Sequence, residues 1–215
     1  MNNFESFKKV NKDAIKRYSE RFNKLGENVK TLGWGSKKQQ FLRFKALLSS
    51  VNLNNCSILD IGCGFGDLLF FLKKSNISFS KYYGWDINKN LLEVAKKNNP
   101  EGDFSLKDIL LIEPYEVADV GIMLGLLNYN LKSKNIDNME FTKSMIEKAY
   151  SLIKKKLVVD FLSTNLDVNY PKEDFVHYHN PEEILSFGLS ISQNVQIIHN
   201  YPAIPQKEFM LILEK

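Results

Sequence analysis

The sequence has only two cysteines, Cys56 and Cys63, which are too few for a disulfide framework or a zinc cluster. Its longest apolar run, near Val120 to Leu127, is far shorter than the ~18 residues that a membrane-spanning helix needs. The segment from Met1 to Glu5 lacks the apolar core of a signal peptide. We therefore expect a cytoplasmic protein with no membrane partner, held together without a metal ion or disulfide.

Neither sign of charge is in large excess, because 29 Lys and Arg stand against 25 Asp and Glu, for a net charge of +4. This small surplus gives little support to a nucleic-acid partner. The chain also lacks internal repeats and a linker, and a domain of this size buries about 70% of the surface that its unfolded chain exposes. We expect residues 1–215 to form one domain. The oligomeric state stays open at this stage.

One stretch combines a buried strand, a glycine turn and a helix. Residues 57–61 are mostly apolar, and apolar residues return at helical spacing from 68 to 72. Gly62, Gly64 and Gly66 lie between them. Glycine allows positive φ and lets a ligand approach the main chain closely, as in the strand-to-helix turns of nucleotide sites. The stretch predicts a site for a cofactor with an adenosine part.

The same stretch lacks what a phosphate site uses. No Gly-Lys-Ser/Thr follows the glycines, which excludes a P-loop, and no Lys or Arg occurs from 57 to 72. The third glycine of a dinucleotide fingerprint is displaced, because Gly66 comes one residue early and Asp67 occupies its position. Asp60 and Asp67 instead place negative charge on both sides of the turn. S-adenosylmethionine, which has a positive sulfonium and no phosphate, fits this turn better than NAD.

Two further aspartates follow predicted strands. Asp86 ends the segment from Tyr82 and is placed where an acid can bind both ribose hydroxyls; alternatively, it is a turn residue before a helix capped by Asn88. Asp108 follows a strand at 104–106 and has the alternative of a turn or helix cap.

The pattern Asp60-x-Gly62-x-Gly64-x-Gly66, followed by Asp86 and Asp108, resembles the cofactor site of class I S-adenosylmethionine-dependent methyltransferases, over roughly residues 40–215. In that family the turn holds the methionine part, the acid at Asp86 binds ribose and the acid at Asp108 meets the adenine amino group. The resemblance implies a set of cofactor-binding residues: Asp60, Gly62, Cys63, Gly64, Gly66, Asp86, Ile87, Asp108, Ile109, Leu124 and Gly125.

N-terminal helices cover the cofactor in this family, so the resemblance assigns residues 1–50 to a helical lid and 51–215 to a Rossmann-like core. Trp34 and Arg43 are then candidates to touch the cofactor, Arg43 through the methionine carboxylate. A packing Trp and a surface Arg are the alternatives.

The order of predicted elements indicates an α/β fold of the Rossmann-like class I methyltransferase type. We expect a mostly parallel seven-stranded sheet with an antiparallel last strand and helices on both faces. The expected helices are 5–25, 36–50, 88–98, 141–153 and 181–187, with Gly26 and Gly188 as the stops of the first and last. The expected strands are 57–61, 82–86, 104–106, 117–124, 157–162, 195–199 and 209–213.

The end of the fourth strand lacks two features of other methyltransferases. No Pro-Pro follows Asn128, which counts against methylation of a base, and no acid is present to ligate a divalent cation, so no metal site is expected. Asn128 and Tyr129 are candidate acceptor contacts, with a strand-terminating turn as the alternative.

The segment 163–179 is long and rich in aromatic residues, so we expect it to line the acceptor pocket. Tyr170 and Tyr178 would shape that pocket, and His177, with a reference pKa near 6.5, is the candidate proton acceptor. His177 as an ordinary loop residue is the alternative.

The expected function is metal-independent transfer of a methyl group from S-adenosylmethionine to a small-molecule acceptor by in-line displacement. An RNA or protein methyltransferase, an NAD-dependent oxidoreductase and a non-catalytic binder of adenosyl ligands are the other hypotheses.

Overall fold

A seven-stranded sheet forms the centre of the protein in a computed structural model that describes residues 3–131, 136–166, 169–201 and 207–215. The strands lie in the order β3-β2-β1-β4-β5-β7-β6. Only β7 runs antiparallel to its neighbours, so the predicted Rossmann-like fold is confirmed. The strands are β1 (Ser57–Ile61), β2 (Lys81–Asp86), β3 (Asp103–Leu106), β4 (Ala118–Met123), β5 (Ile153–Leu162), β6 (Asn194–Ile198) and β7 (Glu208–Glu214).

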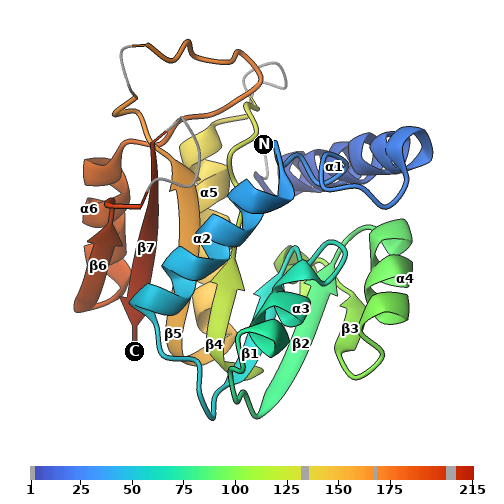
Figure 1. Ribbon diagram of the computed structural model, residues 1–215. Coiled ribbons are helices and arrows are strands. Elements are labelled where there is room, and N and C mark those ends of the chain that lie inside the picture. Colours follow the sequence, from blue (N-terminus) through green and yellow to red (C-terminus); the bar gives the residue numbers. More distant parts are fainter. Residues whose placement is uncertain (1–2, 132–135, 167–168, 202–206) are drawn as a thin grey trace.

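Helices cover both faces of this sheet, and each face has its own hydrophobic core. One core joins the sheet to α2, α3 and α4, and the other joins it to α5 and α6. The helix α1 lies across one end of the sheet (Figure 1). The helices are α1 (Asn3–Leu25), α2 (Lys37–Ser50), α3 (Asp67–Lys74), α4 (Lys89–Asn98), α5 (Asn138–Ser151) and α6 (Pro181–Ile191), with a 3-10 turn η1 (Ile109–Leu111).

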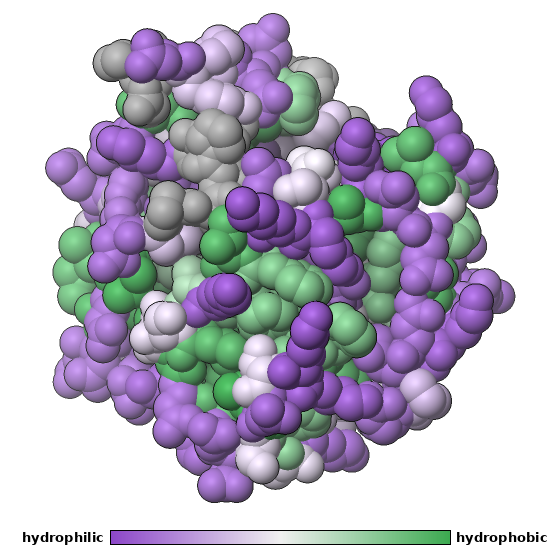
Figure 2. Space-filling model, viewed as in Figure 1, coloured by the Kyte–Doolittle hydropathy of each residue, from purple (hydrophilic) through white to green (hydrophobic). Residues whose placement is uncertain are grey.

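The face that carries α2 and α3 has a central hydrophobic area with hydrophilic residues around it (Figure 2). Three phenylalanines join these two helices, with the ring centroids of Phe41 and Phe44 each within 5.4 Å of that of Phe71. Phe70, in the same helix as Phe71, is 49% exposed. The aromatic contacts therefore fix α2 against α3.

Local signals placed several helix ends correctly. The Ser36 hydroxyl accepts a hydrogen bond from the Gln39 N–H at the start of α2, and the Asn88 side chain accepts from two N–H groups at the start of α4. Gly26, at φ +62°, follows the last residue of α1. These ends depend on short-range hydrogen bonds, which is why the sequence predicts them.

The predicted stop at Gly188 is wrong, because α6 continues to Ile191. A Cβ on Gly188 would lie 3.0–3.1 Å from side-chain atoms of Val195, Leu211 and Leu213. The glycine is there to let α6 approach β6 and β7 closely, a packing need that its position in the sequence does not reveal.

The strand β5 starts earlier than predicted, at Ile153, which is paired with Ala118 of β4. Three lysines follow within the strand, at 154–156. In the structure Lys155 forms an ion pair with Asp119 at 3.0 Å, and Lys156 forms one with Glu214 at 3.2 Å. Carboxylates on the two neighbouring strands thus make a charged segment compatible with the sheet.

Candidate functional site

The glycine turn leaves the carboxyl end of β1 and is tied to the end of β2. The N–H groups of Gly62 and Cys63 both donate to the Trp85 carbonyl oxygen, at 2.7 and 3.1 Å. Gly62 and Gly64 have φ of +77° and +54°, a region that other residues avoid. A Cβ on Gly62 would lie 2.8 Å from Leu126 Cδ1. The turn therefore leaves a narrow concave space beside its main chain.

Asp86, at the end of β2, faces this turn. Its Oδ2 accepts a hydrogen bond from the Gly64 N–H at 2.9 Å, and its Oδ1 accepts from the Asn88 N–H at 2.8 Å. The residue is only 8% exposed, and burial raises the pKa of its carboxyl, although these two N–H donors oppose the shift. Two backbone donors thus fix the orientation of a buried carboxylate at the turn.

The other two aspartates near the turn already have partners. Asp60 accepts a hydrogen bond from the Tyr82 hydroxyl, and burial raises the pKa of Asp60 to about 7. Asp67 accepts from Gln40 Nε2 at 2.9 Å and pairs with Lys37. The cation that α2 brings to the turn is therefore engaged by a carboxylate.

Asp108 has the predicted role of a helix cap and also binds a side chain of α1. Its Oδ1 caps η1 by accepting from the Leu110 N–H at 3.0 Å, while its Oδ2 accepts from Asn11 Nδ2 of α1 at 2.7 Å. A second polar contact brings α1 to the same region, because Asn88 Nδ2 donates to the Ile15 carbonyl and to Ser19 Oγ. The helix α1 is thus attached over the carboxyl ends of β2 and β3.

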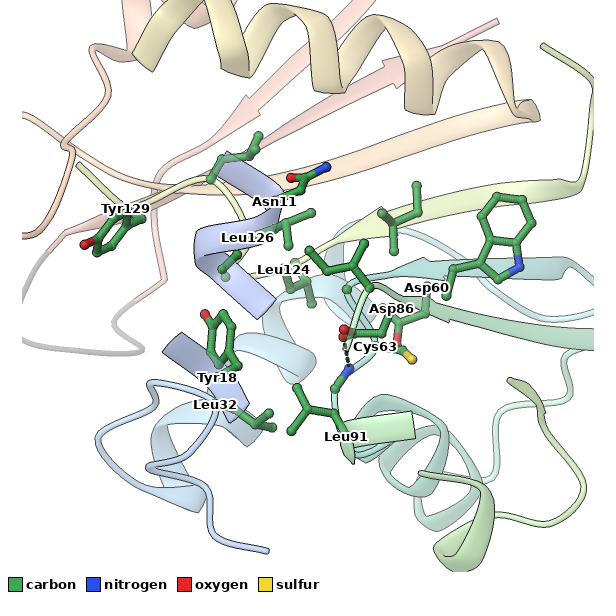
Figure 3. Close-up of a pocket in the computed structure, with 18 of the residues that line it drawn as sticks. Asn11, Tyr18, Leu32, Asp60, Cys63, Asp86, Leu91, Leu124, Leu126 and Tyr129 are labelled. Atoms are coloured by element: carbon green, nitrogen blue, oxygen red, sulfur yellow. Dashed lines mark hydrogen bonds between the residues drawn. The ribbon is translucent and has the colours of Figure 1, made fainter. Parts of the chain in front are cut away.

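These groups line one pocket beneath α1. In Figure 3, Asp60, Cys63 and Asp86 lie at one end of it, and Tyr18 and Tyr129 lie at the other. Burial raises the pKa of the Cys63 thiol well above its ordinary value, so this cysteine is an apolar filler rather than a nucleophile. Twelve of the predicted site residues line the pocket: Trp34, Asp60, Gly62, Cys63, Gly64, Asp86, Ile87, Asp108, Ile109, Leu124, Gly125 and Tyr129.

Arg43 does not line the pocket, so its predicted contact with a cofactor carboxylate is wrong. It is 3% exposed, its Nε lies 2.8 Å from Asp160 Oδ2, and its guanidinium also pairs with Glu208. Trp34 stacks on the other side, with its ring 4.1 Å from the guanidinium carbon. The Gly125 N–H donates to Asp160 Oδ1 at 2.5 Å. Arg43 therefore supports the pocket wall from behind.

Gly66 and Asn128 have structural roles rather than the predicted ligand contacts. Gly66 precedes α3 with positive φ, and a Cβ there would lie 2.8 Å from Asn99 Nδ2. Asn128 Oδ1 accepts from the Leu162 N–H at 2.8 Å, and its carbonyl accepts from the His177 N–H. Both residues hold neighbouring elements together.

None of the described residues of the predicted acceptor loop, 163–179, lines the pocket, although Val176 of this segment is bridged to the lining residue Tyr129. The His177 ring packs edge-on against His179 at 4.5 Å, and the Tyr178 hydroxyl accepts from the Glu173 N–H. Tyr170 is half-buried near Glu173 and Tyr178, and burial raises its pKa. His177 and Tyr178 thus have partners within their own segment, which the composition of the segment did not reveal.

Pocket residues on α1 were missed as site residues. Val10, Asn11, Ala14, Arg17 and Tyr18 all line the pocket from this helix. They follow helical spacing and so share one face of α1. The sequence shows this spacing, but the spacing predicts only that one face of the helix is buried. It does not predict that this face lines a ligand pocket.

Two kinds of feature are absent from the described residues. No helix among them is both long and apolar enough to cross a membrane. Nor do the described His, Cys, Asp and Glu side chains include a group of three or more placed to hold a metal ion.

Comparison with known proteins gives a family and a fold. A model of the methyltransferase domain family matches residues 52–159. The demethylmenaquinone methyltransferase of Lactococcus lactis is 33% identical over 94 residues, which cover 43% of this chain. The match spans about a third of that relative, 36% of its length.

Two solved structures share the fold over nearly the whole chain. The magnesium protoporphyrin IX methyltransferase of Synechocystis PCC 6803, with bound S-adenosylhomocysteine, has a TM-score of 0.63 and 17% identity, covering 98% of this chain and 99% of its own. The N-methyltransferase NodS of Bradyrhizobium japonicum, also with S-adenosylhomocysteine, has a TM-score of 0.64 and 13% identity, covering 93% and 98%.

Replacing Arg43 tests its structural role. Arg43→Met leaves two buried carboxylates without their cation, so we expect a loss of about 3–5 kcal/mol in the free energy of unfolding. Lys73→Met is the control, because Lys73 pairs with Glu101 at the surface and should change stability by less than about 1 kcal/mol. Urea unfolding measures both. Equal, small losses would show that the buried ion pairs contribute little.

The pKa of Asp60 predicts a pH dependence. Its folded value of about 7 lies above the ordinary 3.8, so the native state binds an extra proton between these values and this group destabilises the fold as pH rises toward 7. Asp60→Asn keeps an acceptor for Tyr82 and cannot titrate. We expect its unfolding free energy, relative to the wild type, to rise between pH 5 and pH 8.

Asp119→Asn is the matched control, because hydrogen bonds from Ser57 lower the pKa of Asp119 to about 2. Its difference from the wild type should be constant between pH 5 and pH 8. A flat difference for Asp60→Asn as well would mean that Asp60 is ionised throughout this range.

Proposed function

The chain belongs to the methyltransferase domain family, and from this premise we propose that it transfers a methyl group from S-adenosylmethionine to a small-molecule acceptor. The observation that carries the proposal is the glycine turn at β1 with the buried Asp86 carboxylate held against it. The expected cofactor suits this site, because the glycine main chain is exposed to the pocket and because the adenosine part offers hydroxyls to a carboxylate.

The residues that would hold the cofactor come from the ends of three neighbouring strands, β1, β2 and β3. The turn from Gly62 to Gly64 would take the methionine part, Asp86 the ribose and Asp108 the adenine side. When bound, S-adenosylmethionine supplies a methyl group on a positively charged sulfur. The charge near the turn favours this cofactor over NAD, because Asp60 and Asp86 lie there and Lys37 is paired with Asp67, which leaves little to attract a pyrophosphate.

The acceptor end of the pocket supports a small, largely apolar substrate. Leu127, Leu131, Phe141 and Met145 line it and are all less than 8% exposed. The helix α1 closes over it, so a folded RNA or protein would require this helix to move away. We assign α1 and α2 to a lid that excludes water and orients the acceptor, and orientation alone supplies about 7–11 kcal/mol of a reaction barrier.

Proton removal does not need a residue of the 163–179 segment in this scheme. The lining residues of the acceptor end are mostly hydrocarbon, and the structure directs His177 toward His179. The chain's contribution is to position two reactants in a dry pocket. The proposal therefore includes methyl transfer without a metal ion.

Calorimetric titration tests the cofactor. Wild-type protein should bind S-adenosylmethionine and S-adenosylhomocysteine and not NAD. Asp86→Ala should lose about tenfold to hundredfold in affinity, because one hydrogen bond to a charged acceptor contributes about 1.5–3 kcal/mol. Asp86→Asn keeps one acceptor oxygen, so its cofactor affinity should lie between that of the wild type and that of Asp86→Ala.

Asp103→Ala is the control, since Asp103 lies on the neighbouring strand β3, is about half exposed and does not line the pocket. Circular dichroism checks that each variant is folded. Unchanged affinity in Asp86→Ala removes Asp86 from the site, and micromolar binding of NAD alone would reject the proposed cofactor.

A fractionated cell extract tests the acceptor class. With S-adenosylmethionine and EDTA present throughout, we expect release of S-adenosylhomocysteine with the small-molecule fraction, and much slower release from Asp86→Ala at the same S-adenosylmethionine concentration. Turnover only with the RNA or protein fraction would replace the proposed acceptor class. Turnover that EDTA abolishes would overturn metal independence.

A further inference from the structure

Arg17 is the cation on the part of α1 that faces the acceptor end of the pocket. Its guanidinium carbon lies 3.7 Å from the centroid of the Tyr129 ring and 5.1 Å from that of Tyr18. The side chain is half-buried, and both tyrosines line the same pocket. The guanidinium therefore lies against one aromatic face, with a second aromatic ring close by.

Tyr129 is a rigid support for this cation. Its carbonyl oxygen accepts a hydrogen bond from Asn138 Nδ2 at 2.7 Å, and its backbone forms an isolated bridge with Val176. A guanidinium on an aromatic face keeps its N–H donors directed outward in its own plane. Arg17 is thus orientated before any ligand arrives.

Arg17 has no carboxylate within ion-pair distance among the residues that the structure describes. Asp13 lies one turn earlier on the same helix and also lines the pocket. Asp108 is bound to Asn11, and Asp86 lies at the opposite end of the pocket from Tyr18 and Tyr129 (Figure 3). The positive charge at this end is therefore not neutralised by the carboxylates of the cofactor end.

The pocket that Arg17 lines also has strongly buried apolar walls. Leu127 is 3% exposed, Leu131 2% and Phe141 7%, and none of them offers a hydrogen bond to a guanidinium. Partial burial of a charge among apolar side chains is unfavourable unless an opposite charge or a hydrogen-bond acceptor joins it. A ligand with an anionic group and an apolar body would pair with the Arg17 guanidinium and pack on the apolar lining residues.

We propose that Arg17 binds a carboxylate of the methyl acceptor, and that the acceptor is a small acid with an apolar or aromatic body. A planar carboxylate can accept two parallel N–H bonds from the guanidinium fork, which a neutral amide cannot. The apolar body then packs on Leu131, Phe141 and Met145. This inference rests on the proposed function and names the substrate class for the same pocket.

The test uses two pairs of probes that differ only in charge: 2-naphthoate with 2-naphthamide, and benzoate with benzamide. Binding is measured by ligand-observed NMR and calorimetry, with and without saturating S-adenosylhomocysteine. For the wild type we expect at least one of the acids to bind about tenfold more tightly than its amide, as for one charge-assisted hydrogen-bond pair. Arg17→Gln should abolish this preference, and Arg17→Lys should retain part of it.

Lys16→Gln is the matched control, because it removes one positive charge from the next position of α1, where Lys16 is 76% exposed at its side chain and faces away from the pocket. It should leave the acid preference unchanged. Asp13→Asn should strengthen acid binding, because it removes the carboxylate closest along the helix.

Three outcomes would overturn the inference. They are no preference for either acid in the wild type, a preference that persists in Arg17→Gln, and an equal loss of preference in Lys16→Gln. If Arg17→Gln instead weakens S-adenosylhomocysteine and leaves 5′-methylthioadenosine, which has no carboxylate, unaffected, then Arg17 binds the cofactor and the acceptor assignment is wrong. Failure of wild-type protein to bind any adenosyl ligand would reject the proposed function, while the measurements without it still decide the role of Arg17.

Discussion

The hydrogen bond from the Gly64 N–H to the Asp86 carboxylate is the contact on which the rest of the site depends. It ties the glycine turn after β1 to the end of β2, and the same carboxylate accepts the Asn88 N–H at the start of α4. Asn88 in turn binds the backbone and a side chain of α1. A single buried acid thus positions the turn, the next helix and, through that helix cap, the segment that covers the pocket.

A second group of charges supports the opposite wall. Arg43 of α2 connects β5 and β7 through Asp160 and Glu208, while Trp34 stacks on its guanidinium. Asp160 also fixes the Gly125 N–H where the chain leaves β4. Two buried carboxylates with different partners therefore hold parts of the site in place. Asp86, which lines the pocket, is bound by backbone N–H groups, and Asp160, behind the wall, is bound by both a backbone N–H and a cation.

The sequence was informative where structure depends on neighbours along the chain. The strand of residues 57–61, the turn from Gly62 and the cap at Ser36 follow from local preferences and were predicted correctly. Arg43 and His177 were misassigned because their partners, Asp160 and His179, were either distant in sequence or not recognisable as partners from composition. Gly188 was misread for the same reason, since its packing against β6 and β7 is a property of the folded molecule. Arg17 escaped notice because a charged residue on an amphipathic helix ordinarily faces solvent.

The two ends of the pocket are built from different parts of the chain, so the acceptor end can change in evolution independently of the cofactor end. The carboxyl ends of β1 and β2 supply the turn and Asp86, whereas one face of α1 supplies Val10, Ala14, Arg17 and Tyr18. Substitutions on that helix face alter shape and charge at the acceptor end without disturbing the hydrogen bonds of the turn. Selection for a new substrate can therefore act on α1 while the ancestral cofactor is retained, a separation that lets one scaffold serve many reactions.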